Sequence, residues 1–272
     1  MRGWEVLGEA RQERPDYANF QNAALDKVVE AGINRIRLEV RAGVEHPVDA
    51  FAAWQAAGYP AAPDPAYVQW RAKRYETVND NGDPNSINPV GYHFTELDWA
   101  VEAIVNPLRA KLAAKGEALY VNLSYVAFLA QVTSGVPYVH KTPAEYAEFM
   151  LAAFEHLQQR YGWTPDSIEI ILEPDNILPT WTPSLVGQVI AATGSTLAAR
   201  GFQPDLIAAS TTCMNAAVSY FDGIMAVPGV LPYLKEFSYH RYCGTGLKPA
   251  DDCRARGQRR HRHLDAGVVG RA

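Results

Sequence analysis

The stretch IILEPDN, residues 170–176, joins an apolar strand to a polar loop. Three apolar residues run directly into Glu173, and Pro174 follows at once. Proline has no backbone N–H to donate to a strand ladder, so the strand predicted over 167–173 ends on a carboxylate. A helical pattern precedes this strand and another follows it. The stretch is therefore typical of a strand end in a β/α unit.

The same alternation extends along the chain. Five strands are predicted over 33–40, 118–128, 167–173, 205–211 and 236–242, and residues 3–8 supply the end of an earlier one. Helices are predicted over 19–32, 95–116, 142–162, 182–201 and 215–226. Pro107 is expected to kink its helix, and no regular structure is predicted for 41–94. Strict alternation indicates a parallel sheet with crossover helices.

Two architectures fit a parallel sheet: a doubly wound open sheet and a (β/α)8 barrel. No glycine-rich phosphate-binding turn follows any predicted strand. Each strand has one apolar face and one polar face, as where Ile36 and Leu38 alternate with Arg37 and Glu39. An open sheet covered by helices is apolar on both faces, whereas a barrel gathers polar side chains at its carboxyl-terminal mouth. We therefore predict an incomplete (β/α)8 barrel of about six units over residues 1–250.

Polar side chains from several strands are expected to converge at that mouth: Arg37, Glu39, Asn122, Glu173, His240 and Tyr242. Carboxylates, an amide and an imidazole make directional hydrogen bonds, which suits recognition of hydroxyl-rich ligands. Trp181, eight residues beyond Glu173, is a candidate for stacking on a sugar ring. The sequence thus predicts a carbohydrate site.

Glu173-Pro174 at the end of the fourth strand, with SYHRY two strands later, resembles the retaining, cellulase-like glycoside hydrolases of the (β/α)8 superfamily called clan A. The resemblance covers roughly residues 1–245. It implies hydrolysis of O-glycosidic bonds in an oligo- or polysaccharide by two carboxylates, with Glu173 as the acid/base and no cofactor.

The sequence departs from that family at two points. Leu172 stands where the family has an asparagine, and Asn176 is a candidate substitute for binding substrate. The family's nucleophile is a glutamate at the end of strand seven, but no glutamate follows Glu236. We therefore expect this chain to lack the nucleophile strand and to be inactive, although an intact parent would be a hydrolase.

The last residues, 254–272, differ in composition from the rest. They hold six arginines and one acidic residue, a net charge of +5. Because the whole chain has a net charge of −5, residues 1–253 carry −10. One interpretation is a solvated basic tail that binds an acidic partner. The other, which we favour, is out-of-frame translation, so that 251–272 is a non-native or disordered tail on a truncated chain.

Composition and charge limit the classes of partner that we expect. A net charge of −5 gives no reason to expect nucleic acid or an anionic membrane, and no apolar run reaches the length of a membrane span. The first residues lack the apolar core of a signal peptide, which leaves the compartment and oligomeric state open. Cys213, Cys243 and Cys253 form neither a metal spacing nor an even disulfide framework, so no metal site is predicted.

Two other functions remain open. One is a carbohydrate-binding or scaffold protein on a degenerate barrel. The other is an aldolase or isomerase, which would need a strand-end lysine or a metal cluster. The lysines all fall outside the predicted strand ends, which disfavours the second.

Overall fold

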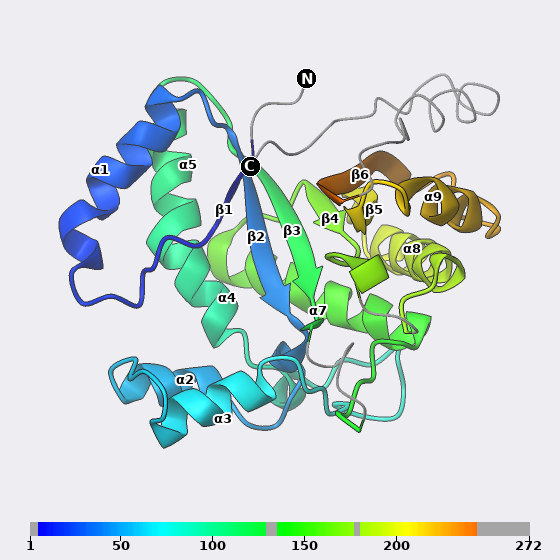
Figure 1. The fold of residues 1–272 in the computed structure, drawn as a ribbon, viewed down its shortest axis with the longest axis horizontal. Coiled ribbons are helices and arrows are strands. Elements are labelled where there is room, and N and C mark those ends of the chain that lie inside the picture. The colour runs from blue at the N-terminus through cyan, green and yellow to red at the C-terminus, as the bar shows by residue number, and fades with distance from the viewer. Residues whose placement is uncertain (1–4, 129–134, 177–179, 244–272) are drawn as a thin grey trace.

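The computed structural model describes residues 5–128, 135–176 and 180–243, so the predicted tail, 251–272, lies outside the described residues. Six strands form one parallel sheet in the order in which they occur along the chain. They are β1 (Glu5–Leu7), β2 (Arg35–Arg41), β3 (Tyr120–Val126), β4 (Ser167–Glu169), β5 (Asp205–Cys213) and β6 (Leu234–Cys243). The prediction of an incomplete (β/α)8 barrel is confirmed (Figure 1).

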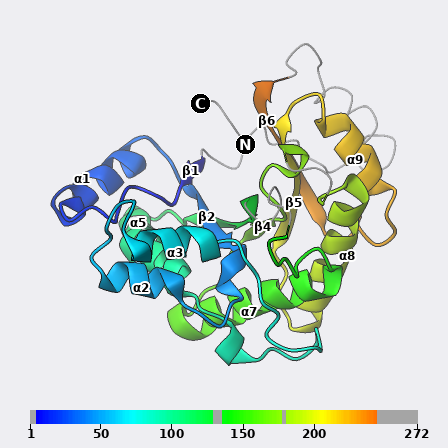
Figure 2. The ribbon, with the colours of Figure 1, turned by 60° about the horizontal axis from the view of Figure 1, so that its bottom comes forward.

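Helices follow the strands and pack outside the curved sheet, as the two views of the ribbon show (Figures 1 and 2). They are α1 (Tyr17–Glu30), α4 (Thr95–Ala100), α5 (Asn106–Ala113), α7 (Pro143–Tyr161), α8 (Pro183–Ala199) and α9 (Ala217–Met225). Two further helices, α2 (Ala50–Ala56) and α3 (Pro65–Lys73), lie beyond the end of β2 in the segment for which no structure was predicted.

The helix predicted over 95–116 is interrupted, as expected, just before Pro107. A π-helical segment, η3 (Val101–Val105), separates α4 from α5. Pro107 has no N–H for the carbonyl of Ala103, four residues earlier. That carbonyl instead accepts hydrogen bonds from the Tyr17 hydroxyl at 3.2 Å and the Gln21 amide at 2.6 Å. The interruption therefore also anchors α1.

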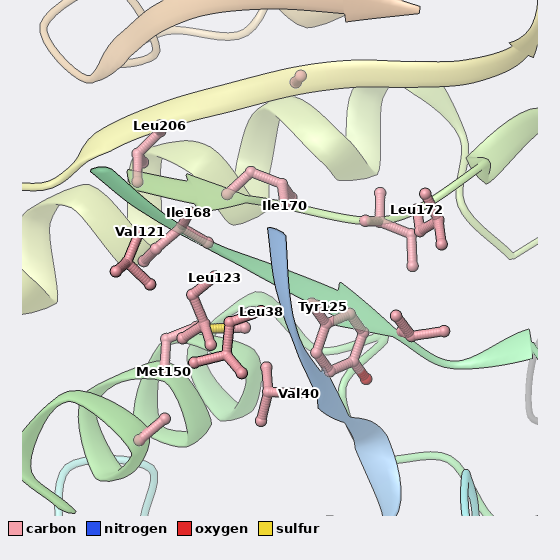
Figure 3. Packing of buried hydrophobic residues seen from close by; sticks show 14 of the residues in the cluster. Leu38, Val40, Val121, Leu123, Tyr125, Met150, Ile168, Ile170, Leu172 and Leu206 are labelled. Carbon is pink, nitrogen blue, oxygen red and sulfur yellow. The ribbon is translucent and has the colours of Figure 1, made fainter. Parts of the chain in front are cut away.

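The core lies between the sheet and the helices. Leu38 and Val40 of β2, Val121 and Leu123 of β3, and Ile168 of β4 are buried and turned toward α7 (Figure 3). Every second residue of these strands therefore faces outward to the helices, which confirms the predicted alternation.

The opposite set of strand residues forms a polar floor at the amino-terminal end of the sheet, made of Glu5, Arg35, Asn122, Ser167 and Glu236. Arg35 Nε lies 2.7 Å from a Glu5 oxygen, and the other end of the guanidinium lies 3.0 Å from a Glu236 oxygen. Glu5 belongs to β1 and Glu236 to β6, the first and last strands of the sheet. One side chain can reach both edges only because the sheet curls.

Removing this arginine should strongly destabilise the barrel. In an Arg35→Leu variant two buried carboxylates lose their cation, and breaking a buried ion pair costs about 3–5 kcal/mol. We expect urea denaturation to show a loss of that size in the free energy of unfolding. Arg200→Leu, which removes an exposed ion pair with Glu155, should cost less than about 1 kcal/mol. Equal losses would mean that the floor does not hold the barrel together.

A second group of acidic side chains, two buried and two partly buried, lies at the start of α7. Glu145 and Glu148 lie near Asp80 and Glu45, which belong to the long segment after β2. Glu45 is paired with the buried His140 at 2.5 Å, whereas one oxygen each of Asp80, Glu145 and Glu148 is buried without a hydrogen-bond partner. Burial, followed by the neighbouring carboxylates, raises the pKa of Glu148 to about 8.

This group predicts a pH-dependent stability. A carboxyl whose pKa is higher in the folded than in the unfolded chain favours folding at low pH, and that contribution is lost as pH rises through the folded pKa. Stability should therefore fall between pH 5 and pH 9, and Glu148→Gln should remove part of the fall, on the order of 2 kcal/mol. Urea denaturation at both pH values measures it. Glu117→Gln, at an exposed position, should leave the fall unchanged.

Candidate active site

Glu173 lies beyond the regular part of β4, on a segment that still bonds to both neighbouring strands. The N–H of Leu172 donates to Tyr125 of β3 at 3.1 Å, and the N–H of Glu173 donates to Ser210 of β5 at 3.0 Å. Pro174 then opens a single turn, η4 (Pro174–Asn176). The segment is thus fixed between β3 and β5 where the mouth begins.

The backbone of Glu173 is strained. Its φ angle is +56°, in the left-handed region that residues with a Cβ rarely adopt. Its N–H donates to Ser210, and its carbonyl accepts from the N–H of Asn176 at 3.2 Å. Strain of this kind persists only where the surrounding structure enforces it, and it is concentrated at functional positions. This feature sets Glu173 apart from the other strand-end carboxylates.

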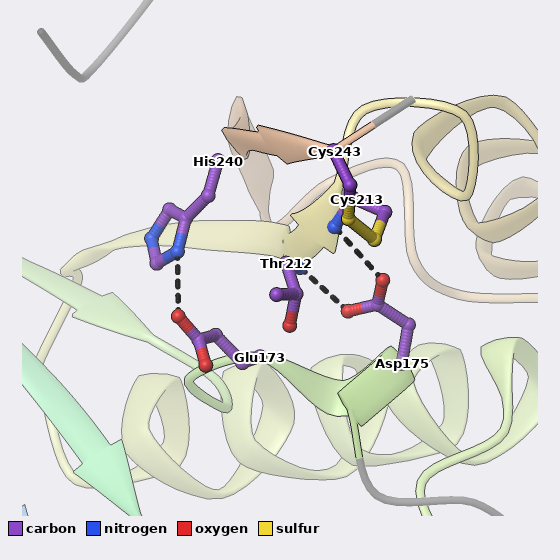
Figure 4. Close-up of a disulfide and its surroundings, with 6 residues drawn as sticks. All are labelled: Glu173, Asp175, Thr212, Cys213, His240 and Cys243. Carbon is purple, nitrogen blue, oxygen red and sulfur yellow. Dashed lines mark hydrogen bonds and ion pairs between the residues drawn. A yellow bond between two sulfur atoms is a disulfide. The ribbon is translucent and has the colours of Figure 1, made fainter. Parts of the chain in front are cut away.

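The side chain of Glu173 meets His240 of β6. His240 Nδ1 lies 2.9 Å from Glu173 Oε1, and both side chains are about 15% exposed (Figure 4). The Tyr242 ring lies 4.9 Å from the His240 ring and is 67% exposed. Three of the residues predicted for the mouth therefore come together from β4 and β6. An imidazole held against a carboxyl group can orient it and exchange a proton with it.

Asp175 ties the Glu173 segment to the end of β5. Its two carboxylate oxygens accept hydrogen bonds from the backbone N–H groups of Thr212, at 2.6 Å, and Cys213, at 3.0 Å (Figure 4). Cys213 is itself joined by a disulfide to Cys243 of β6. The expectation that the cysteines form no disulfide framework is therefore wrong for this pair. Nothing in the spacing of two cysteines 30 residues apart signals that they end neighbouring strands.

Arg37 and Glu39 point into the barrel but pair with each other, and Glu39 also pairs with Arg41. Arg37 lies 3.6 Å from Glu39, whose other oxygen contacts Arg41 at the end of β2. Arg41 also contacts Glu9 and lies 3.5 Å from Glu96. No contact joins this group to Glu173 among the hydrogen bonds and ion pairs of the described residues. The arrangement leaves the Arg37 Nε buried without a partner.

Of the other predicted residues, Asn122 and Trp181 lie away from the Glu173–His240 pair, whereas Asn176 contacts Glu173 through its backbone N–H. Asn122 is in the floor, where it donates to Glu5 at 3.2 Å and accepts from Ser167 at 3.0 Å. Asn176 is exposed on η4. Trp181 is fully buried, so its ring has no free face for a sugar to stack on.

Trp181 instead begins a buried series of side-chain hydrogen bonds that was not predicted from the sequence. Its indole N–H donates to the Tyr138 hydroxyl at 3.0 Å, which contacts the Tyr125 hydroxyl at 3.0 Å. The Tyr125 hydroxyl lies 2.7 Å from His140, the partner of Glu45. Burial raises the pKa of Tyr125, whose ring therefore stays neutral. These hydrogen bonds fix Trp181, eight residues after Glu173.

Within residues 5–128, 135–176 and 180–243, no group of three or more histidine, cysteine or acidic side chains is placed to hold a metal ion. No helix in the same ranges is long and apolar enough to cross a membrane.

Comparison with known proteins places the fold. No protein-family model and no curated protein matches the sequence. Among solved structures, the chain resembles the catalytic domain of the GH30 xylanase C from Talaromyces cellulolyticus, with a TM-score of 0.51, 15% identity and 88% of this chain covered. It also resembles the endo-β1,6-glucanase BT3312, with a TM-score of 0.52, 12% identity and 90% covered.

A GH39 β-xylosidase from Caulobacter crescentus matches with a TM-score of 0.52 and 14% identity over 98% of this chain. In all three cases the match covers 52% of the solved structure, so the chain spans about half the length of these enzymes. Likeness at such low identity concerns the fold. The resemblance noted at Glu173-Pro174 is thus supported at the level of architecture: the chain has the β/α-barrel fold of these glycoside hydrolases, over six of its strands.

Proposed function

We propose that this chain carries the acid/base half of a retaining glycoside hydrolase site, with Glu173 as the acid/base. The observation that carries the proposal is the strained Glu173, bonded to His240 at 2.9 Å at the carboxyl-terminal end of a β/α barrel. Catalytic side chains of such barrels lie at this end of the strands. The solved structures with the same fold include a xylanase, a glucanase and a xylosidase, which supports a β-linked xylose or glucose polymer as substrate.

Glu173 would protonate the departing oxygen of the glycosidic bond. In the second step it would take a proton from the water that releases the sugar. His240 would hold the carboxyl group of Glu173 in one orientation through both steps. The exposed Tyr242 beside it offers a ring face and a hydroxyl to the sugar.

A retaining mechanism also needs a nucleophilic carboxylate about 5–5.5 Å from the acid/base. Two candidate carboxylates, Asp175 and Glu39, have other partners. Asp175 accepts hydrogen bonds from two backbone N–H groups, and Glu39 contacts Arg37 and Arg41. No glutamate follows Glu236 in the sequence. We therefore expect that the chain does not form a glycosyl-enzyme and does not hydrolyse aryl β-glycosides at ordinary enzyme rates.

A small anion can replace a missing nucleophile, which makes the proposal testable. Azide would attack the anomeric carbon of an aryl β-xyloside or β-glucoside, while Glu173 protonates the departing phenol, so that a glycosyl azide forms. We expect the purified chain to form glycosyl azide only when azide is present, as measured by mass spectrometry. With a poorly activated phenol, Glu173→Gln should be at least about 100-fold slower, because general acid catalysis contributes about 10²–10⁴.

Glu117→Gln, which replaces an exposed carboxylate, is the matched control and should behave as the unmodified chain. Hydrolysis without azide would contradict the missing nucleophile. Equal azide reaction in the Glu173→Gln variant would contradict the role of Glu173. Calorimetric binding of xylo- or gluco-oligosaccharides with no azide reaction would favour the second candidate, a carbohydrate-binding protein, which the shortage of nucleophiles also supports.

A further inference from the structure

The strand that carries His240 is irregular where it reaches the site. Thr211 of β5 pairs with Tyr239 of β6, but the next pair is Cys213 with Cys243. One residue of β5 therefore lies opposite three residues of β6, His240, Arg241 and Tyr242. Such a bulge lacks the regular ladder of hydrogen bonds that would fix its backbone.

The bulge is closed at its far end by Cys243. Its sulfur is bonded to Cys213, with the two Cα atoms 4.7 Å apart, and its carbonyl accepts from the N–H of Met214 at 2.9 Å. Within the described residues β6 borders no further strand, and at this end the disulfide and the Met214–Cys243 hydrogen bond tie it to the end of β5. The disulfide is the covalent part of this connection, and it lies three residues from His240.

Cys213, the other half of the disulfide, is also connected to Glu173. The N–H of Cys213 donates to Asp175, two residues after Glu173. The connections run from Glu173 through Asp175, Cys213 and Cys243 to His240, and the ion pair closes them into a ring (Figure 4). Opening the ring at the disulfide loosens the β6 side, where the Met214–Cys243 hydrogen bond is the remaining tie, whereas Asp175 still binds β5.

We propose that the Cys213–Cys243 disulfide is a redox-sensitive positioning element that keeps His240 on Glu173. Cys243 is exposed and Cys213 partly exposed, so a dithiol can reach the bond. A thiolate of the dithiol attacks the Cys243 sulfur and releases the Cys213 thiolate. The second thiol of the reductant then displaces Cys243, leaving two protein thiols and an oxidised reductant. The bulge then opens, and His240 separates from Glu173.

Nitrogen NMR of the histidine side chains tests the separation without relying on catalysis. The protein is labelled with ¹⁵N-histidine, and the His240→Gln variant identifies which signals belong to His240. The buried His140, which is hydrogen-bonded to Glu45, is the internal reference. We expect dithiothreitol to shift the His240 Nδ1 signal and leave that of His140 in place. Reoxidation should restore the original spectrum.

The Cys213→Ser/Cys243→Ser variant should show the reduced His240 signal with or without dithiothreitol, and Cys253→Ser should respond like the unmodified chain. An unchanged His240 signal after reduction would overturn the proposal. So would a shift of His140 as well, because the disulfide would then hold the whole fold.

The catalytic consequence rests on the proposed function of Glu173. If both hold, reduction should slow glycosyl azide formation at least tenfold. A His240 shift with no azide reaction in either state would support the positioning element and count against the proposed function alone.

Discussion

The fold depends on one buried cation that faces two carboxylates. Arg35 stands at the start of β2, and its guanidinium reaches Glu5 of β1 on one side and Glu236 of β6 on the other. A planar group with five N–H donors can serve two carboxylates at once, which an ammonium group does less well. Because these carboxylates belong to the two edges of the sheet, the interaction requires curvature. Curvature in turn directs the carboxyl ends of the strands toward a common axis.

The pair at the mouth follows from that curvature. Glu173 and His240 come from β4 and β6, which are not neighbours in the sheet, yet their side chains are 2.9 Å apart. The left-handed backbone turns Glu173 toward this contact, and Asp175 anchors the turn on β5. The energetic cost of the strained backbone is thus offset by hydrogen bonds from the residues on either side of it.

The sequence allowed prediction of which face of each strand a side chain occupies, because alternation is a local property. Depth within the barrel is not local, since it depends on the stagger between strands. Asn122 and Glu173 were both expected at the mouth, but Asn122 pairs with the first residue of β4 and lies in the floor. The burial of Trp181 likewise depends on Tyr138 and Tyr220, which lie far from it in the chain.

The segment 41–94 was harder to predict because its helices are short and its order comes from aromatic contacts. Trp54 of α2 and Trp70 of α3 stack with their ring centres 4.0 Å apart, with Phe51 and Trp99 beside them. A pattern of period 3.6 is hard to recognise over seven or nine residues. The disulfide and the buried Tyr125–His140 contact were not predicted for a related reason: each joins residues that are brought together only by folding of the sheet.

The polar floor around Arg35 can form only late in synthesis of the chain. Arg35 and Glu236 are separated by 201 positions, so the arginine and Glu5 leave the ribosome long before the second carboxylate exists. At about 5–20 residues per second, roughly 10–40 s separate the synthesis of Arg35 from that of Glu236, and until then only the Arg35–Glu5 part of the floor can form. A contact of such long range is among the last to form in folding. Closure of the curved sheet is therefore a late step, and nascent chains that end before β6 are the form most exposed to edge-to-edge association and to chaperone binding.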